Sequence, residues 1–181
     1  MCIRDSPKTI SRIAGRLYEM GLDKIYERCS EPKETNRQIG PMFRRWLQNK
    51  SLGLNPVPLD EFMSNKNDAI LDGGDKEMMD FANRELNYKR NKGLDFVARF
   101  NNQYVIGEAK FLTDFGGHQN AQFSDAISTL ETKNVNAIKI AILDGVLYIK
   151  GKNKMHNDIT TKYTDYNIMS SLVLREFLYQ L

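Results

Sequence analysis

The chain has 181 residues, 41% hydrophobic and 27% charged, which is enough for one hydrophobic core and short for two. Its net charge of +3 is only mildly basic, so charge alone does not establish a nucleic-acid partner. No run reaches the ~20 apolar residues of a membrane span, no signal peptide is evident, and Cys2 and Cys29 lack zinc-site or disulfide spacing. We therefore expect one compact cytoplasmic domain with no membrane partner.

The first six residues differ in character from the rest of the chain. Met1–Ser6 resembles the translation of a transposase adapter used in sequencing libraries. We therefore expect residues 1–6 to be an artefact of sequencing, as for any appended segment. In that case the natural N-terminus is missing and the protein begins upstream of Pro7.

Residues 7–74 are expected to form an N-terminal helical region. Apolar residues at helical spacing predict one or two helices over residues 7–28, with a break at Gly21, and another from about Asn36 to Asn49. Residues 52–58 are expected to be a loop, and residues 59–70 fit either a helix or a strand. Two basic clusters either follow a phosphate backbone or form solvated helix faces. The first contains Lys33, Arg37, Arg44, Arg45 and Lys50, and the second Arg84, Lys89, Arg90 and Lys92.

A helix is predicted from Asp75, which can cap it, to about Tyr88. The i+3 and i+4 spacing places Glu85 on the apolar side of this helix, beside Ala82. A carboxylate in that position needs an ionic partner or a metal. The alternative is an ion pair between Glu85 and one of the arginines or lysines near it.

Two segments rich in strand-forming residues follow, Gly93–Val97 and Tyr104–Phe111. The short linker between them contains Asn101-Asn102, which predicts a β-hairpin. In the second strand the two-residue period places Glu108 and Lys110 on the same face. A hairpin therefore brings the carboxylates of Asp95 and Glu108 together with the amine of Lys110.

This inventory is suited to metal-dependent hydrolysis of a phosphodiester. Asp95 and Glu108 offer hard oxygen ligands of the kind that bind Mg²⁺, which bridges a few carboxylates to phosphate oxygens. Lys110 can orient the attacking water and offset developing negative charge. The alternative is a surface strand with an exposed Glu108–Lys110 pair, but the apolar neighbours Val105, Ile106, Ala109 and Phe111 disfavour it.

Asp95, twelve intervening residues and then Glu108-Ala109-Lys110 resemble the PD-(D/E)XK nuclease signature. The run from Gly107 to Gln122 resembles type II restriction endonucleases of that superfamily. The resemblance covers residues 75 to 150 best, and residues 75–181 are expected to form the nuclease core. It implies that Asp95 and Glu108 bind the metal, that the Ala109 carbonyl also coordinates it, and that Lys110 is the catalytic lysine. Leu94 stands where the signature has proline, a position that varies in the superfamily.

The resemblance also implies a further acidic residue in the active site. In many relatives this residue comes from a helix before the first motif strand. Glu85 is the better-placed candidate for this catalytic role, and Glu77 is the second.

A helix is predicted from His118 or Gln119 to about Thr132, directly after the second motif strand. Its first turn follows Gly116-Gly117, and a helix N-terminus favours an anion. The polar side chains gathered there can read adenine in a major groove, bond to phosphate, or only begin the helix. These DNA-binding candidates are His118, Gln119, Asn120 and Gln122.

The remaining elements complete an α/β pattern. Ala137–Leu143 is predicted to be the third strand, Asp144-Gly145 a hairpin turn, and Val146–Ile149 the fourth strand. A final helix is predicted from about Tyr166 to Tyr179. The order of elements predicts a mixed β-sheet core flanked by helices, in agreement with a restriction-endonuclease-like fold.

We expect a type II restriction endonuclease that uses Mg²⁺ to cut double-stranded DNA at a short specific site, as a homodimer. A DNA methyltransferase encoded nearby is its expected functional partner, because the host must protect its own sites. One alternative is a nuclease of the same superfamily in DNA repair or junction resolution, which would ignore linear duplex or leave no discrete bands. Another is a non-catalytic DNA-binding module, which has no reason to retain the charges of Asp95, Glu108 and Lys110.

Overall fold

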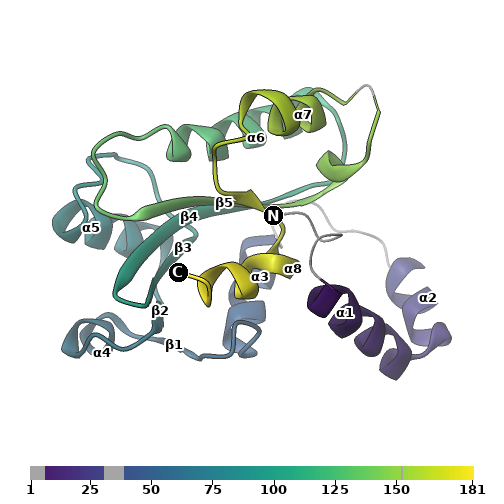
Figure 1. Cartoon of the computed structure of the whole chain (residues 1–181), viewed down its shortest axis with the longest axis horizontal. Helices are drawn as coiled ribbons and strands as arrows, with labels where there is room; N and C mark the ends of the chain where they lie inside the picture. The colour runs from purple at the N-terminus through teal and green to yellow at the C-terminus, as the bar shows by residue number, and fades with distance from the viewer. Residues whose placement is uncertain (1–6, 31–38, 152) are drawn as a thin grey trace.

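The protein is built around a six-stranded mixed sheet with helices on both faces (Figure 1). The computed structural model describes residues 7–30, 39–151 and 153–181. The expected α/β class, a mixed sheet flanked by helices, is confirmed. The adapter-like segment, Lys33, Arg37 and the expected start of a helix at Asn36 lie outside the described residues.

The strands lie in the sheet in the order of the sequence. They are β1 (Pro56–Val57), β2 (Ala69–Leu71), β3 (Phe96–Phe100), β4 (Gln103–Leu112), β5 (Ile138–Gly145) and β6 (Ile168–Met169). β3 is antiparallel to both β2 and β4, whereas β4, β5 and β6 run parallel to one another. The predicted hairpin is confirmed: Asn101 and Asn102 both have positive φ, 50° and 62°, as a two-residue hairpin turn requires.

The helices divide between the two faces of the sheet because each strand alternates its side chains. Along β5, Ile140 and Ile142 face a core that includes residues of α3 (Ile39–Gln48) and α8 (Ser171–Leu178). Ala141 and Leu143, between and after them, face α6 (Gly117–Leu130) on the other side. α4 (Leu59–Ser64) and α5 (Asp75–Glu85) enclose a further apolar cluster with β2, β3 and β4.

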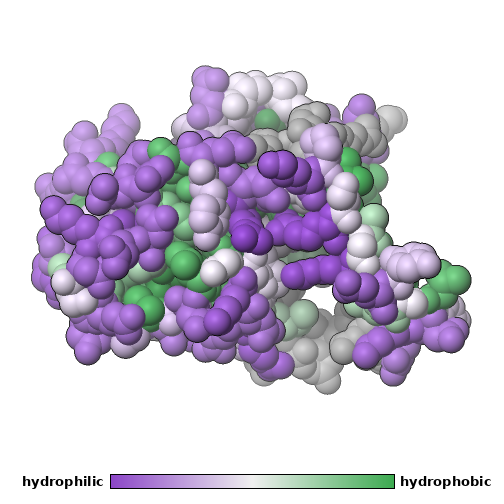
Figure 2. All heavy atoms as spheres, turned by 60° about the horizontal axis from the view of Figure 1, so that its bottom comes forward, coloured by the Kyte–Doolittle hydropathy of each residue, from purple (hydrophilic) through white to green (hydrophobic). Residues whose placement is uncertain are grey.

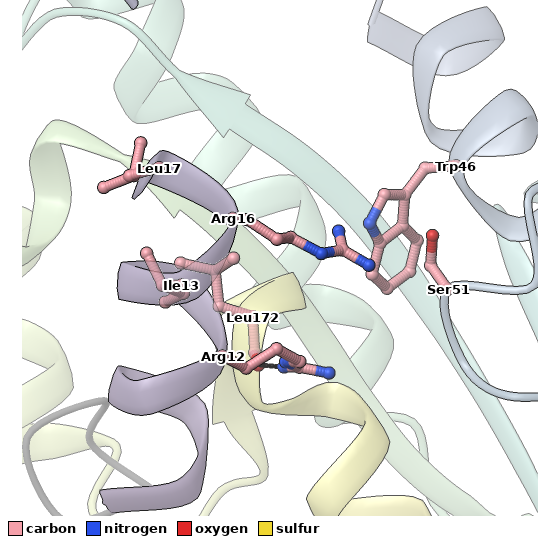
Figure 3. Close-up of a pocket in the computed structure, with 7 residues that line it drawn as sticks. All are labelled: Arg12, Ile13, Arg16, Leu17, Trp46, Ser51 and Leu172. Carbon is pink, nitrogen blue, oxygen red and sulfur yellow. Dashed lines mark hydrogen bonds between the residues drawn. The ribbon is translucent and has the colours of Figure 1, made fainter. Parts of the chain in front are cut away.

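The N-terminal helices are α1 (Pro7–Met20) and α2 (Leu22–Ser30), and the predicted break lies at Gly21, where φ is 78°. α1 contacts α8, since an Arg12 Nη donates to the carbonyl of Leu172 at 2.7 Å (Figure 3). A cavity of about 150 Å³ lies between α1, α3 and α8. It is lined by Arg12, Ile13, Arg16, Leu17, Trp46, Ser51 and Leu172. The region expected to be helical also supplies β1 and β2 to the sheet.

The second predicted hairpin is wrong. β5 ends at Gly145, and Val146–Tyr148 form a 3₁₀ turn in place of a strand. Gly145 has φ 108° and ψ −146°, which is not the conformation of a two-residue hairpin turn, and a Cβ there would lie 2.0 Å from the carbonyl oxygen of Leu112. The turn buries Leu147 against the α6 side of the core. The chain then continues into α7 (Lys154–Asn157) and a π-helical turn, Asp158–Lys162.

The final helix begins later than predicted. Ile168 and Met169 pair with Ala141 and Ile142 of β5, so this segment is an edge strand. Ser170 then caps α8, its hydroxyl oxygen accepting from the Leu172 amide at 3.2 Å.

Hydrophilic side chains cover most of the face shown in Figure 2, with smaller apolar areas between them. Among the residues described, no helix is both long enough and apolar enough to cross a membrane.

Candidate active site

The hairpin of β3 and β4 creates the site by bringing the two motif segments side by side. The Asp95 amide donates to the carbonyl of Gly107 at 3.1 Å, so Asp95 lies just before β3 and beside β4. The Ala109 amide in turn donates to Oδ2 of Asp95 at 2.9 Å. The carboxylate of Asp95 therefore lies beside β4, just before the first residue of β3.

Lys110 joins the two predicted carboxylates. Its Nζ lies 2.9 Å from Oδ2 of Asp95 and 2.8 Å from Oε2 of Glu108. Burial acts to lower the pKa of Lys110, but the charges of Asp95 and Glu108 outweigh it and raise that pKa. Lys110 is therefore a cation at neutral pH, and the structure brings together all three residues of the predicted motif.

Glu108 is the most enclosed of the three, with 2% of its side chain exposed. Burial raises the pKa of its carboxyl group, and the nearby charge of Asp95 adds to this effect. Lys110 and Lys92 act in the opposite direction. A buried carboxyl group with a raised pKa beside two lysines is a feature of functional sites more than of surface strands.

The donor set of the site suits a magnesium ion. Within the described ranges, no group of three or more His, Cys, Asp or Glu side chains is arranged to hold a metal. Mg²⁺ does not need such a group, because it keeps several waters and uses one or two carboxylates with substrate phosphate oxygens. Asp95 and Glu108 supply two carboxylates. The Ala109 amide donates to Asp95, and the N–H and C=O of one residue in a strand point to the same side. The Ala109 carbonyl therefore also lies on the Asp95 side of β4.

The predicted DNA-binding residues on α6 do not share one environment. Gln119 is 3% exposed and its amide donates to Thr113 Oγ1 at 3.2 Å, so its side chain faces the loop after β4 and not the surface. Asn120 donates to the carbonyls of Phe115 and Gly116 and so stabilises the loop before its own helix. His118 is exposed and lies 3.1 Å from the amide nitrogen of Gln122. At the start of α6, His118 is therefore exposed and Gln122 is half-buried.

Glu85 does not face the apolar side of its helix as expected. It is exposed and its carboxylate pairs with Arg84 at 2.6 Å, which is the alternative weighed above. The opposite end of α5 is the one next to the motif, because the Leu94 amide donates to the carbonyl of Asp75 at 3.2 Å. Asp75 and Glu85 are ten positions apart, which separates them by about 15 Å along the helix axis. Glu77 is also exposed.

The basic residues differ in the same way. Arg44 pairs with Asp75, while Arg45 is exposed on α3. Arg90 and Lys92 were expected either to contact a phosphate backbone or to lie on a solvated helix face. In the structure both side chains point toward α6. Arg90 donates to Ser128 and Thr132, and Lys92 pairs with Asp125 at 2.9 Å. Arg90 and Lys92, two members of the second basic cluster, therefore anchor the segment before β3 onto α6.

Lys92 and Asp125 are the site residues that sequence analysis missed. Lys92 Nζ reaches Oε1 of Glu108 at 3.3 Å, on the other side of the carboxylate from Lys110. Lys92 precedes Asp95 by three residues, outside any strand period, and Asp125 lies on α6. Only the packing of α6 on β4 brings them to Glu108, so no spacing in the sequence signals this contact.

Comparison with known proteins agrees with this geometry. A family model described as Tsp45I type II restriction enzyme matches residues 1–181, the whole chain. Searches of curated proteins and of solved structures found no significant match. Type II restriction enzymes cleave DNA at specific sites within restriction-modification systems. The chain belongs to the Tsp45I family of type II restriction enzymes.

Proposed function

We propose that this protein hydrolyses phosphodiester bonds of double-stranded DNA at a short specific site, with Mg²⁺, through a PD-(D/E)XK active site. Asp95 and Glu108 are the proposed metal ligands, with the carbonyl of Ala109, and Lys110 is the proposed catalytic lysine. The observation that carries the proposal is the placement of Lys110 Nζ 2.9 Å from Asp95 and 2.8 Å from Glu108.

The donor set supports a divalent cation on that side of the sheet. Two carboxylates and one carbonyl are hard oxygen ligands, and Glu108 is nearly fully buried. Bound Mg²⁺ supplies polarisation of the phosphoryl group and a lower pKa for a coordinated water. Asp95 is held for this role by the Ala109 amide, which orients one carboxylate oxygen at 2.9 Å.

Lys110 acts on the substrate in this proposal. Its ammonium carries a full charge, because both neighbouring carboxylates raise its pKa. It sits at the edge of the site with 22% of its side chain exposed, within reach of an incoming phosphate. There it orients the attacking water and offsets the negative charge that develops on the phosphate oxygens.

The exposed end of α6 is the proposed contact with DNA. His118 and Gln122 lie one turn apart on α6, six and ten residues after the end of β4. Their amide and imidazole groups can reach base edges or phosphates. Arg45, exposed on α3, is a further proposed phosphate contact. We also propose a homodimer with one active site for each strand, and a DNA methyltransferase encoded nearby that protects the host sites.

The proposal is tested by digesting a plasmid of known sequence with the purified protein in Mg²⁺ and in EDTA. The expected result is a set of discrete fragments in Mg²⁺ with one common sequence at their ends, and none in EDTA. Cleavage of four-way junctions with no cleavage of linear duplex would instead support the junction-resolving alternative. A smear without preferred ends would contradict site specificity.

A further inference from the structure

Lys92 has no role in the proposed chemistry, yet its ammonium enters the site. Four oxygen atoms surround Lys92 Nζ at hydrogen-bond or ion-pair distance. They are the Asp125 carbonyl at 2.8 Å, Asp125 Oδ1 at 2.9 Å, Thr129 Oγ1 at 3.2 Å and Glu108 Oε1 at 3.3 Å. Two of the four belong to carboxylates, and all are hard ligands of the kind that hold a divalent cation.

The two oxygens of Glu108 are divided between two lysines. Oε2 contacts Lys110 at 2.8 Å, and Oε1 faces Lys92. Oε1 is fully buried and makes no hydrogen bond to any described residue, so its negative charge is balanced by the Lys92 ammonium through the ion pair alone. A buried carboxylate oxygen without hydrogen bonds is costly, and a cation beside it reduces this cost.

The position of Lys92 is fixed from outside the hairpin. Asp125 and Thr129 lie four residues apart and therefore on the same side of α6. Thr129 is buried, and the Lys92 side chain is 20% exposed, so the ammonium is enclosed between α6 and β4. Lys92 therefore connects Glu108 to the same helix that begins with the exposed His118 and the half-buried Gln122.

We propose that the Lys92 ammonium is a resident cation that takes the place of a second divalent ion beside Glu108. The site then accepts one divalent ion, on the side of Oε2 and Asp95, while Lys92 holds Oε1 and positions Glu108 against α6. The oxygens around Nζ lie at 2.8 to 3.3 Å, which suits an ammonium, whereas Mg²⁺ requires about 2.0–2.1 Å. This inference rests on the proposed function, since it assumes that Asp95 and Glu108 bind an ion.

The test counts bound ions in the full chain by Mn²⁺ electron paramagnetic resonance, without DNA or turnover. Wild type is expected to bind about one Mn²⁺ per chain, and Lys92→Ala about two, because the oxygen cage is then open. Lys92→Met is the matched control: it fills the same space without a charge and is expected to bind about one. Circular dichroism confirms that each variant is folded. A second ion in wild type, or one ion in Lys92→Ala, would overturn the proposal.

A measurement on wild type alone keeps the proposal testable if Lys92→Ala does not fold. The ¹⁵N-ammonium resonance of Lys92, assigned with Lys92→Arg, is expected to remain protected from exchange when Mg²⁺ saturates the protein. The Lys110 resonance is expected to shift in the same titration. Loss of protection at Lys92 would mean that the ion displaces it, which rejects a resident cation.

The two proposals fail in different ways. If wild type binds no Mn²⁺ and cuts no DNA, the metal site on Asp95 and Glu108 is wrong, and the inference falls with it. If wild type cuts DNA with one ion and Lys92→Ala also holds one, only the role of Lys92 is wrong.

Discussion

Lys110 Nζ lies 2.8 Å from Oε2 of Glu108, the residue two positions before it on β4. The two-residue period of the strand puts both side chains on the same face, and the ammonium also contacts Asp95 at 2.9 Å. In the ion-free protein Lys110 therefore lies between the two proposed metal ligands. A divalent ion that binds both carboxylates must share them with this ammonium or move it.

Lys110→Ala is predicted to lose cleavage but retain specific DNA binding. The rate should fall by about 10²-fold or more, the scale for one preorganised electrostatic group, because the water and phosphate lose their cationic partner. Affinity for the divalent ion should stay the same or tighten, since a competing charge is removed. Single-turnover cleavage in Mg²⁺ and duplex binding in Ca²⁺ measure the two effects. Lys76→Ala, exposed on α5, is the control. Parallel loss of binding and cleavage would make Lys110 a phosphate-positioning residue instead.

The stability of the ion-free protein is predicted to fall as pH rises through the range where Glu108 ionises. Burial, with the charge of Asp95, raises the pKa of Glu108 above its ordinary value of 4.5, so the folded state binds its proton more tightly than the unfolded state. Lys110 stays protonated over this pH range, because its pKa is raised above 10.5. Its contribution to the stability of the folded state is therefore fully present below that value.

The measurement is the free energy of unfolding in EDTA, from about pH 4.5 upward, for wild type and Glu108→Gln. The variant has no carboxyl group at this position, so its free energy of unfolding should increase relative to that of wild type as pH rises. The difference should stay constant once Glu108 is fully ionised. Parallel pH profiles would show that Glu108 does not titrate abnormally. Mg²⁺ should reverse the wild-type loss, since the ion favours the ionised carboxylate.

Local patterns in the sequence were sufficient to predict the hairpin of β3 and β4 that brings Asp95, Glu108 and Lys110 together. Asn101-Asn102 specify the turn, and strand alternation places Glu108 beside Lys110, so the geometry depends on neighbours in the chain. The same reasoning failed at Asp144-Gly145. There the Asp144 carboxylate accepts from Ser170 and Ser171, residues far along the chain, and β5 pairs in parallel with β4.

Long-range packing also decided the outcome for the remaining site residues. Glu85 has apolar neighbours at helical spacing, yet α5 ends at this residue. The Glu85 side chain points outward and pairs with Arg84. From the sequence, Lys92 is indistinguishable from a surface lysine, but the packing of α6 on the sheet encloses it beside Glu108. Gln119 was expected to face DNA and instead lies buried against Thr113. Each case depends on contacts between elements that no single segment specifies.

Gln122→Ala is predicted to weaken binding to the cognate duplex more than binding to random duplex. A lost bidentate contact with a base edge costs about 1–3 kcal/mol, and the neutral amide releases no counterions, so the salt dependence should change little. Binding titrations in Ca²⁺ on cognate and scrambled duplexes measure both affinities. Gln119→Ala is the comparison: its buried side chain should affect stability and leave the ratio of the two affinities unchanged. Equal losses on both duplexes for Gln122→Ala would reject base readout.

Glu85→Gln is predicted to retain the wild-type cleavage rate within about twofold, because an exposed ion pair with Arg84 contributes little free energy. Steady cleavage at saturating Mg²⁺ is the readout. A loss as large as that expected for Lys110→Ala would return Glu85 to the active site and require α5 to move on binding DNA.

In the proposed site, Asp95 and Glu108 together hold the divalent ion, and each carboxylate can be replaced by an amide of nearly the same shape. Asp95→Asn and Glu108→Gln are each predicted to abolish Mg²⁺-dependent cleavage of a cognate duplex while circular dichroism remains that of the folded protein. Asp60→Asn, exposed on α4, is the control and should cut like wild type. The direct measurement is the single-turnover rate of the variants at saturating Mg²⁺. A folded Asp95→Asn or Glu108→Gln protein that cuts at the wild-type rate would show that the replaced carboxylate does not hold the ion needed for cleavage.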